Sequence, residues 1–564
     1  MTRELSNEWQ AAVRQGYVTQ NYAEQQCFGP APSDRVEPDK QEKKSASTVL
    51  VEMAQEKYTF GVSTTGETFA IPTTGPKVVS LLRGSKTSLR NQLAKEYYAR
   101  HGKVPPQQSL ADALLVIGGM AQESDEQELV LRTYRSGGDM WLDLGDPSGQ
   151  AIRVTENGWC VEEQAPVLFK RTVLNGPLPM PERGGDLAEL WKFMNVTDAD
   201  KPLLTAWLVA ALMHDIPHPV LALFGEQGTG KTTLQKMLVS TIDPGPVPIR
   251  KPPRDPESWV TAAAGSWLVA LDNLSDVQPW LSDSICRAVT GDGDVRRKLY
   301  TDGEHSVFAF RRCICLNSIH LGGSRGDLAE RMLPITLEVI PDEHRLTEDE
   351  IWREWDRRHP VILGALLDVA ASVARVLSSV RLESKPRMAD FARVLKAVDT
   401  VLGTHGLDHY LDKLAELSAD SLTGSPFMLA LTAMSGGFEG TSAELLTRLT
   451  PDRPPKGWPV NAGSVTQQLK RHAPALRRSR WLVTDDGGRN KQHAISWTIK
   501  RPEIACNSHS PDSPTRQNGA NGESASAASA DYGPSQDDHC PACSGEGDGC
   551  RWCEGTGLNP EAAS

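Results

Sequence analysis

A short apolar run leads directly into a glycine-rich loop near the middle of the chain, and this feature constrains the fold more than any other. Residues Val220 to Phe224 are apolar, the loop from Gly225 to Thr232 reads GEQGTGKT, and a helix is expected from about Thr233. The spacing G-x-x-x-x-G-K-T between a strand and a helix is that of a phosphate-binding loop. A chance glycine-rich turn seldom has both the motif and this context. We therefore expect a P-loop domain of the α/β class.

The residue types in this loop suit the binding of ATP. Glycines let the backbone N–H groups turn toward the phosphates, where the N-terminus of the following helix also favours negative charge. Lys231 is expected to reach the β- and γ-phosphates, and the Thr232 hydroxyl to ligate Mg²⁺. The expected nucleotide contacts are Gly225, Gly228, Gly230, Lys231, Thr232, Thr233 and, from a later strand, Asp272.

Two later apolar strands end in polar residues. The strand from Trp267 ends at Asp272, about forty residues after the loop, as expected for a Walker B aspartate that serves Mg²⁺. The strand from Cys313 ends at Asn317, whose amide can hold the attacking water or the γ-phosphate; a simple strand cap is the alternative. An apolar strand followed by Asp is common in α/β proteins, and the upstream loop favours the functional interpretation.

The order of these motifs resembles that of superfamily 3 helicases, in particular phage-type primase-helicases with a poxvirus-like helicase module. Walker A, Walker B, a basic turn-rich segment and the Asn317 strand follow one another within about a hundred residues, like motifs A, B, B-prime and C of that family. The basic segment, residues 290–302 and then 308–312, looks like the B-prime hairpin, which in that family grips single-stranded DNA inside a hexamer. By matching position, the candidate DNA contacts are Arg296, Arg297, Lys298 and Tyr300. A solvated charged turn is the alternative.

The resemblance covers about residues 185–340 and implies an AAA+-like ATPase that forms a homo-oligomer, a hexameric ring in that family. Arg325 and Arg331 precede the next strand, and either could serve a neighbouring subunit as an arginine finger. We select Arg331, with a surface salt bridge as the alternative. One position departs from the family pattern, because Asp272 is followed by Asn273 and not by a second carboxylate. Either Asp276 or a residue elsewhere supplies the base, or hydrolysis is slow.

The predicted fold class is multidomain α/β, with a central P-loop ATPase, an N-terminal α+β domain, a C-terminal winged helix and a small zinc-binding tail. We expect a helix and flexible linker over 1–47, the α+β domain over 48–181, the ATPase over 182–345, a helical domain over 346–435, the winged-helix-like domain over 436–503, a disordered linker over 504–538 and a zinc knuckle over 539–558.

Charge is distributed unevenly along the chain. The net charge is −12, yet residues 441–502 hold twelve Lys and Arg against four Asp and Glu. Such asymmetry indicates a nucleic-acid partner. Within the winged-helix-like segment, Arg477, Arg478 and Arg480 are expected to contact phosphates, which supplies affinity but not sequence choice. Winged helices also mediate protein contacts, and that alternative stays open.

These features predict an ATP-dependent DNA helicase of a phage or mobile element, acting on single-stranded or forked DNA. Primase or other replication proteins are expected partners. A DNA-binding ATPase switch without unwinding activity is the alternative, and the intact Lys231 and Thr232 argue against a degenerate P-loop. No apolar run is long enough to span a bilayer and no signal-like segment begins the sequence, so we expect no membrane contact and a cytoplasmic location.

Four of the ten cysteines lie close together near the C-terminus, as two CxxC knuckles rich in following glycines. Cys540, Cys543, Cys550 and Cys553 have the spacing of a tetrahedral structural Zn²⁺ site. The pattern is similar to the zinc module of J-domain co-chaperones, with two repeats only. A redox CxxC is the alternative, but nothing around it resembles a thioredoxin fold.

We predict about one Zn²⁺ per chain, bound by these four thiolates. Chelation should unfold only the tail, because a Ser- and Ala-rich linker separates it from the rest of the chain. Elemental analysis of the purified protein, with a variant carrying Ser at all four positions as control, measures the metal. A zinc-free native protein would exclude the site.

Overall fold

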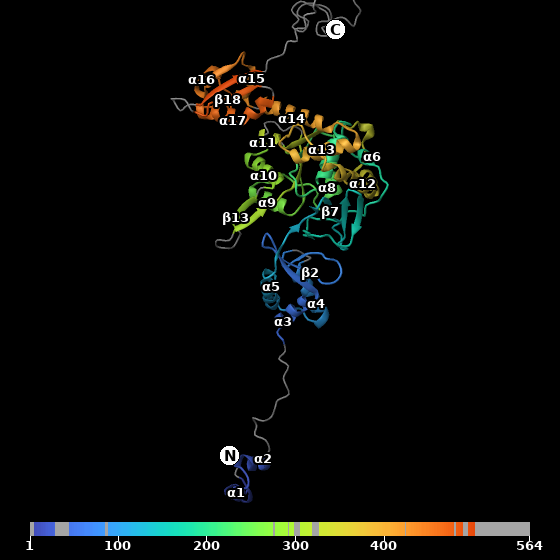
Figure 1. Cartoon of the computed structure of the whole chain (residues 1–564), viewed down its shortest axis with the longest axis vertical. Coiled ribbons are helices and arrows are strands. Elements are labelled where there is room, and N and C mark those ends of the chain that lie inside the picture. Colours follow the sequence, from blue (N-terminus) through green and yellow to red (C-terminus); the bar gives the residue numbers. More distant parts are fainter. Residues whose placement is uncertain are drawn as a thin grey trace, which may run out of the picture. The chain divides into compact units, whose positions relative to one another are not determined.

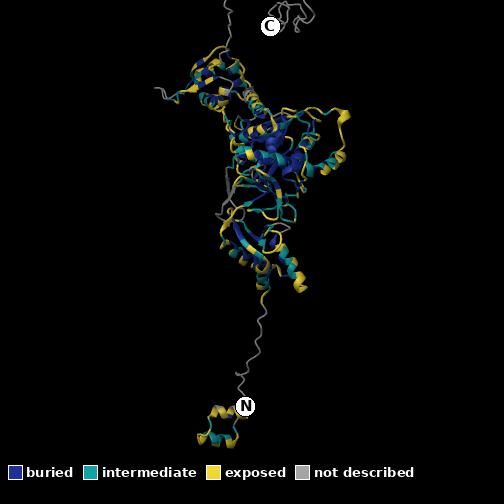
Figure 2. Cartoon of the chain, turned by 45° about the vertical axis from the view of Figure 1, so that its right-hand side comes forward, coloured by how far each residue is buried: buried dark blue, intermediate teal, exposed yellow. Residues whose placement is uncertain are grey.

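The computed structural model describes residues 5–28, 44–84, 88–274, 277–291, 293–297, 305–318, 326–423, 425–478, 481–488 and 495–501 (Figure 1). The first described segment forms two helices, α1 (Asn7–Arg14) and α2 (Gln20–Phe28), so its predicted helical character is confirmed. Figure 2 shows that buried residues gather around the central part of the chain.

The range 48–181, predicted as one α+β domain, contains two separate four-stranded sheets. The first has the order β3-β2-β1-β4 and packs against helices α3, α4 and α5 around a small core of its own. Its elements are α3 (Ala46–Lys57), β1 (Tyr58–Ser63), β2 (Thr68–Pro72), β3 (Ser80–Leu81), α4 (Leu89–His101), α5 (Gln107–Gln122) and β4 (Glu126–Gln127).

The second sheet is an antiparallel meander, β6-β7-β8-β9, accompanied by the short parallel pair β10-β5. Its inward side chains, including Leu142, Ile152 and Val154, belong to the same hydrophobic cluster as the central domain. Packing thus joins the meander to the central domain and separates it from the first sheet. Local sequence patterns do not reveal this boundary within the range 48–181. The strands are β5 (Leu129–Val130), β6 (Thr133–Ser136), β7 (Asp139–Asp143), β8 (Ala151–Thr155), β9 (Gly158–Glu162) and β10 (Leu168–Phe169).

The central domain is built on a parallel sheet with the order β12-β15-β11-β16. Arg250 adds a single parallel bridge to Leu271 beyond β12. The elements up to this sheet's last strand are α6 (Ala188–Trp191), α7 (Lys201–Ala210), β11 (Val220–Phe224), α8 (Lys231–Ile242), α9 (Pro256–Ala264), β12 (Leu268–Leu271), α10 (Pro279–Thr290), β13 (Gly293–Arg297), β14 (His305–Ala309), β15 (Cys313–Asn317), α11 (Gly326–Ala329) and β16 (Met332–Thr336).

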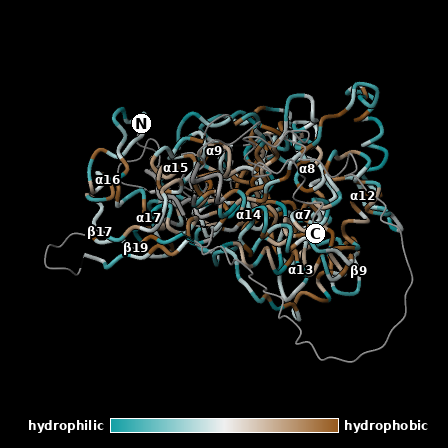
Figure 3. The backbone as a smooth tube through the Cα atoms, turned by 90° about the horizontal axis from the view of Figure 1, so that it is seen from above, coloured by the Kyte–Doolittle hydropathy of each residue, from teal (hydrophilic) through white to brown (hydrophobic). Residues whose placement is uncertain are grey.

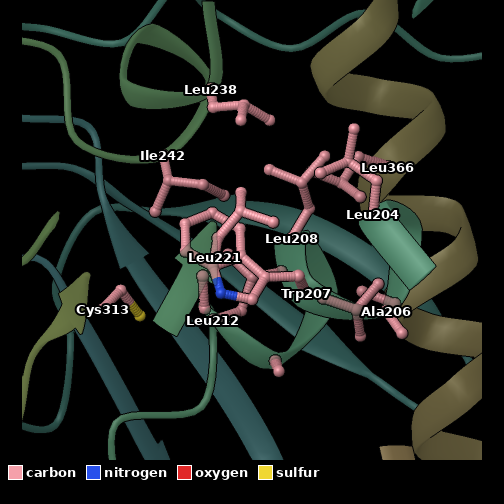
Figure 4. Close-up of a cluster of buried hydrophobic side chains, with 14 of the residues drawn as sticks. Leu204, Ala206, Trp207, Leu208, Leu212, Leu221, Leu238, Ile242, Cys313 and Leu366 are labelled. Carbon is pink, nitrogen blue, oxygen red and sulfur yellow. The ribbon is translucent and has the colours of Figure 1, made fainter. Parts of the chain in front are cut away.

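Both faces of this sheet are covered, which explains why its strands are apolar throughout. Along β11, Leu221 and Leu223 join one hydrophobic cluster, and Val220 and Ala222 join another on the opposite face. Figure 4 shows the first cluster around Trp207, whose indole N–H also donates to the Pro219 carbonyl at 3.0 Å. Apolar segments around α7 and α13 (Ala389–Leu402) extend the same cluster (Figure 3).

Helices fill the range that follows, beginning with α12 (Glu348–Leu377) and continuing through α13 to α14 (Gly406–Thr423). Among the described residues, α12 is the one helix long and apolar enough to span a membrane by length and composition. Its Ile362, Leu363 and Leu366 belong to the main core, and its Asp368 accepts the Trp159 indole N–H at 2.9 Å. These contacts are those of a core helix in a folded domain.

The C-terminal described region has its own hydrophobic core. It comprises α15 (Pro426–Ala433), β17 (Phe438–Thr441), α16 (Ser442–Leu449), α17 (Ala462–Arg478), β18 (Leu482–Asp485) and β19 (Ser496–Lys500), and the sheet has the order β17-β19-β18. Reciprocal hydrogen bonds between Thr441 and Glu444 form a capping box at the start of α16. The strands β18 and β19 that follow α17 pair antiparallel, and β17 pairs with β19.

A buried ion pair links the meander to the central domain. Arg132 is fully buried, and its Nε donates to Asp243 Oδ1 at 2.9 Å, at the end of α8. The remaining guanidinium nitrogens donate to the carbonyls of Asp143 and Gly176. Asp243 Oδ2 accepts the backbone N–H of Trp267 at 2.8 Å, at the start of β12. Every charge in this contact is therefore compensated.

Replacing Arg132 by Met should lower the free energy of unfolding by about 3–5 kcal/mol, because Asp243 would stay buried without its counter-charge. Arg153→Met is the matched control in the same meander, since the Arg153 side chain is 40% exposed and solvent screening leaves its pair with Asp139 little stabilising effect. Denaturant unfolding measures both. Equal losses of unfolding free energy for the two variants would mean that the buried pair stabilises the fold no more than the exposed one.

Candidate nucleotide-binding site

The glycine-rich loop joins β11 to α8, as the sequence predicts. Gly225, Gly228 and Gly230 all have positive φ, at 149°, 83° and 79°. Space as well as backbone conformation requires glycine here, since a Cβ on Gly225 would lie 2.9 Å from the Leu337 carbonyl oxygen. A Cβ on Gly228 would lie 3.1 Å from Arg345 Nη2. Residues of the segment that follows β16 thus approach the loop closely at these two glycines.

Lys231, the first residue of α8, folds its side chain back over the loop. Its Nζ donates to the carbonyl oxygens of Gly225 and Glu226, both at 2.6 Å. Partial burial lowers the pKa of Lys231, and the nearby Asp272 carboxylate partly offsets this effect. The ammonium group is therefore held by the concave backbone of the loop. Thr233, further along the first turn of α8, is half-buried.

Asp272 directly follows β12 and faces the start of α8. The Thr232 hydroxyl lies 3.2 Å from Asp272 Oδ1. Asn317, the last residue of β15, donates through Nδ2 to the same carboxylate oxygen at 2.7 Å. The structure thus brings Lys231, Thr232, Asp272 and Asn317, the residues predicted around the nucleotide, to one edge of the sheet. These groups are two hydrogen-bond donors, a hydroxyl and a carboxylate, which suit a phosphate chain and a hard cation.

Two residues at this edge were missed by sequence reasoning. Gln235 lies fully buried on α8 and accepts a hydrogen bond from Asn317 Nδ2 at 2.8 Å. Arg345 lies beside Gly228 and pairs with Asp342 Oδ1 at 2.7 Å. Gln235 follows Lys231 by one helical turn, a spacing that could have drawn attention to it. Arg345 carries no local signal, because its position depends on how the chain folds back after β16.

Asn273 occupies the position where a second carboxylate was expected. It is exposed and, among the described residues, is the one non-glycine with positive φ, at 53°. Its backbone N–H donates to Asn317 Oδ1 at 2.6 Å, which holds this conformation in place. Asp276, the alternative base, lies outside the described residues.

Arg331 lies in the interior of its own chain. Its side chain is 9% exposed, and it forms an ion pair with Asp327, whose carbonyl oxygen it also contacts at 2.9 Å. In this conformation the guanidinium is not presented to a neighbouring subunit. Arg325, the other arginine considered for that role, lies outside the described residues.

The predicted hairpin is present as the antiparallel pair β13–β14, with Arg297 opposite His305. The backbone of Arg296 and Arg297 lies on β13, whereas Lys298 and Tyr300 fall outside the described residues. Two arginines anchor the base of the hairpin. Arg311 donates to the carbonyls of His214 and Thr290, and Arg312 donates to the Ala263 carbonyl at 2.6 Å. These contacts fix β14 at the point where the chain continues into β15.

Two further groups of predicted residues are only partly described. Arg477, on α17, donates from Nε to the Val483 carbonyl at 2.9 Å. The side chain of Arg478, together with Arg480, lies outside the described residues, as do the four tail cysteines. Among the residues that are described, no group of three or more His, Cys, Asp or Glu side chains is suited to a metal ion.

Two family models match this chain. Residues 187–420 match the model described as actinomycete integrative conjugative element replication protein, and residues 427–514 match the AICE RepA C-terminal domain. The two matches together span more than half of the sequence. They identify the chain as a replication protein of a conjugative mobile element. Of the two origins expected from the sequence, a phage or a mobile element, the matches indicate the mobile element.

Solved structures give alignments of low similarity. The apo structure of the NrS-1 C-terminal region (305–718) aligns with a TM-score of 0.35 and 11% identity, covering 81% of this chain and 100% of that one. The structure titled SCCmec type IV Cch, active helicase, aligns with a TM-score of 0.40 and 12% identity, covering 79% and 93%. At these values the alignments carry no argument about activity. A search of curated proteins gives no significant match.

Replacing Lys231 by Ala should lower the rate of ATP hydrolysis by about 100-fold or more. The fold should stay intact, because the Lys231 ammonium contacts only the loop and not the hydrophobic core. Lys236→Ala is the matched control on the same helix, since the Lys236 ammonium pairs with Glu348 at 3.0 Å. Phosphate release and thermal unfolding, measured for both variants, separate the two effects. Full turnover in the Lys231 variant would exclude this nucleotide site.

Proposed function

We propose that the protein is an ATP hydrolase that couples hydrolysis to movement along DNA during replication of its mobile element, and so acts as a helicase. One observation carries this proposal. The β13–β14 hairpin continues through Arg311 and Arg312 into β15, and β15 ends at Asn317 beside Asp272. A force applied to the hairpin can therefore pass along β15 to the edge of the sheet where the residues of the nucleotide site lie.

Thr232 and Asp272 are the residues that would hold Mg²⁺. Their oxygens lie 3.2 Å apart, and hydroxyl and carboxylate oxygens are ligands that this cation accepts. Bound Mg²⁺ would neutralise charge on the phosphates. Lys231 binds the phosphate chain as the loop carbonyls release its ammonium, and Asn317 donates to the γ-phosphate or the attacking water.

The DNA contacts fall in two places. Arg296, Arg297, Lys298 and Tyr300 of the hairpin bind single-stranded DNA, with the tyrosine stacking on a base. The C-terminal described region has the order of a winged helix, with α15, β17, α16, α17 and then the strand pair β18–β19. Its Arg477, Arg478 and Arg480 contact phosphates. The four tail cysteines bind Zn²⁺ in a separate module.

The protein acts as a ring of identical chains, in which an arginine from one subunit reaches the nucleotide of the next. Arg331 can serve this purpose only if its ion pair with Asp327 opens, because its side chain is 9% exposed. Arg325 is the alternative donor. Mixing subunits that carry Lys231→Ala with subunits that carry Arg331→Ala should restore hydrolysis at some interfaces if Arg331 acts in trans.

A DNA-binding ATPase switch is the second candidate function. Asn273 favours it, since an amide cannot accept a proton as a carboxylate does, and slow hydrolysis suits a switch better than a motor. In that case the chain would hydrolyse ATP and bind DNA without separating strands. ATP-dependent strand displacement on a forked duplex distinguishes the two functions.

Replacing Arg297 and Lys298 together by Ala should leave basal ATPase near normal and remove both DNA stimulation and strand displacement, because the hairpin is the predicted point of grip. The control is Lys95→Ala with Lys103→Ala, which removes the same charge from exposed positions near α4. If the hairpin variant displaces strands as fast as wild type, the hairpin is a solvated turn and is not the DNA contact through which the motor acts.

A further inference from the structure

Gln235 is a polar side chain enclosed where three elements of the central domain meet. It has no exposed surface, and its neighbours Leu234 and Leu238 on α8 are buried apolar residues. A buried amide is costly unless its hydrogen-bonding groups are satisfied. All of its polar atoms have partners, which are Asn317 itself and the carbonyls one or two residues before Asp272 and Asn317.

Its amide nitrogen bonds to both strands that carry the site. Nε2 donates to the Leu271 carbonyl at 3.0 Å, immediately before Asp272, and to the Cys315 carbonyl at 3.1 Å, two residues before Asn317. Its Oε1 accepts from Asn317 Nδ2 at 2.8 Å. Gln235 thus ties the helix that begins at Lys231 to β12 and β15 at once.

The orientation of both amides follows from their partners. The backbone N–H of Asn273 can only donate, so the Asn317 atom facing it is Oδ1. Asn317 Nδ2 must then supply one hydrogen to Asp272 and the other to Gln235. The Leu271 and Cys315 carbonyls can only accept, which fixes the Gln235 amide in turn. No other arrangement satisfies every group.

We propose that Gln235 is a positioning residue for ATP hydrolysis, which holds the Asn317 amide so that a single N–H is available to the γ-phosphate or attacking water. This inference rests on the proposed function of the site. One N–H of the Asn317 amide remains hydrogen-bonded to Gln235 Oε1 in the buried interior. The other, on Asp272, lies at the open edge and can be exchanged for a substrate oxygen. Gln235 itself does not touch the nucleotide.

The test uses the full chain with Gln235→Met, which keeps the side-chain length and removes the hydrogen bonds. We expect kcat to fall about 100-fold, since losing the orientation of one catalytic donor costs this much. The Kd for a fluorescent ATP analogue should stay within about threefold of wild type, because Lys231 and the glycine loop are unchanged. A split between kcat and Kd is not expected of a residue that only stabilises the fold.

Thr241→Val is the matched control. Thr241 is equally buried on α8, and its hydroxyl donates to the Met237 carbonyl at 2.8 Å without reaching Asn317. This variant should lose stability while its kcat per folded molecule stays at the wild-type value. A similar fall in kcat for both variants would reduce Gln235 to a general packing role and overturn the proposal.

Gln235→Glu provides a second variant if Met prevents folding. Its carboxyl can accept from Asn317 in either protonation state, but only the protonated form can donate to a strand carbonyl. Burial raises the pKa of such a carboxyl. The kcat of this variant relative to wild type should therefore rise as the pH is lowered from about 8 to about 6. The wild-type profile accounts for the other titratable groups at this position, Asp272, Lys231 and the Cys315 thiol.

The outcomes distinguish a failure of the proposed function from a failure of the positioning role of Gln235. If wild type neither binds nor hydrolyses ATP, the proposed function fails and the role of Gln235 fails with it. If wild type hydrolyses ATP, Lys231→Ala does not, and Gln235→Met turns over at the wild-type rate, only the positioning role is overturned. A flat relative pH profile for Gln235→Glu would overturn it in the same way.

Discussion

The hydrogen bond between Asn317 and Asp272 depends on the register of the parallel sheet, and the rest of the site depends on that register too. Leu271 pairs with Leu316, so the next residues along β12 and β15 meet at the same edge. Leu223 of β11 pairs with Asn317, which brings the glycine loop to that edge as well. Because successive side chains alternate between faces, a slip of one residue would turn these groups away from one another.

The continuous burial of these strands is what fixes the register. The sheet is covered on both faces by separate hydrophobic clusters, and no polar side chain interrupts β11 or β12. Two buried polar groups inside the domain, Gln235 and the Arg132–Asp243 pair, are satisfied by specific partners. Apolar burial therefore supplies the stability, while a small number of buried hydrogen bonds define the geometry of the edge.

The same parallel sheet provides mechanical coupling between the β13–β14 hairpin and the edge that carries the nucleotide site. Arg311 and Arg312 use their guanidinium groups to bond carbonyls at the ends of α9 and α10, the helices on either side of β12 in the chain. Helix C-termini are favourable places for positive charge. The hairpin base is thereby held to the body of the domain, immediately before the strand that ends at Asn317.

Local signals predicted the elements well and long-range contacts poorly. The glycine loop, the strands that lead to Asp272 and Asn317, and the hairpin each rest on a few adjacent residues, and all are present. Gln235 and Arg345 act through residues distant in sequence. The one-turn spacing from Lys231 is the local feature that marks Gln235, and no local pattern marks Arg345. The meander joins the central domain through Arg132 and shared apolar packing, which made the predicted range 48–181 too simple. Arg331 shows a second limit, because a partner only four residues away, Asp327, determines whether its side chain can reach outward.

The most direct test of a coupled motor is the steady-state ATPase rate of the full chain with and without single-stranded DNA, recorded alongside its mass by light scattering in the presence of ATP. We expect hydrolysis that single-stranded DNA stimulates several-fold, from a particle containing several chains. Hydrolysis that is indifferent to DNA, from a particle with the mass of one chain, would contradict coupling between the hairpin and the nucleotide edge.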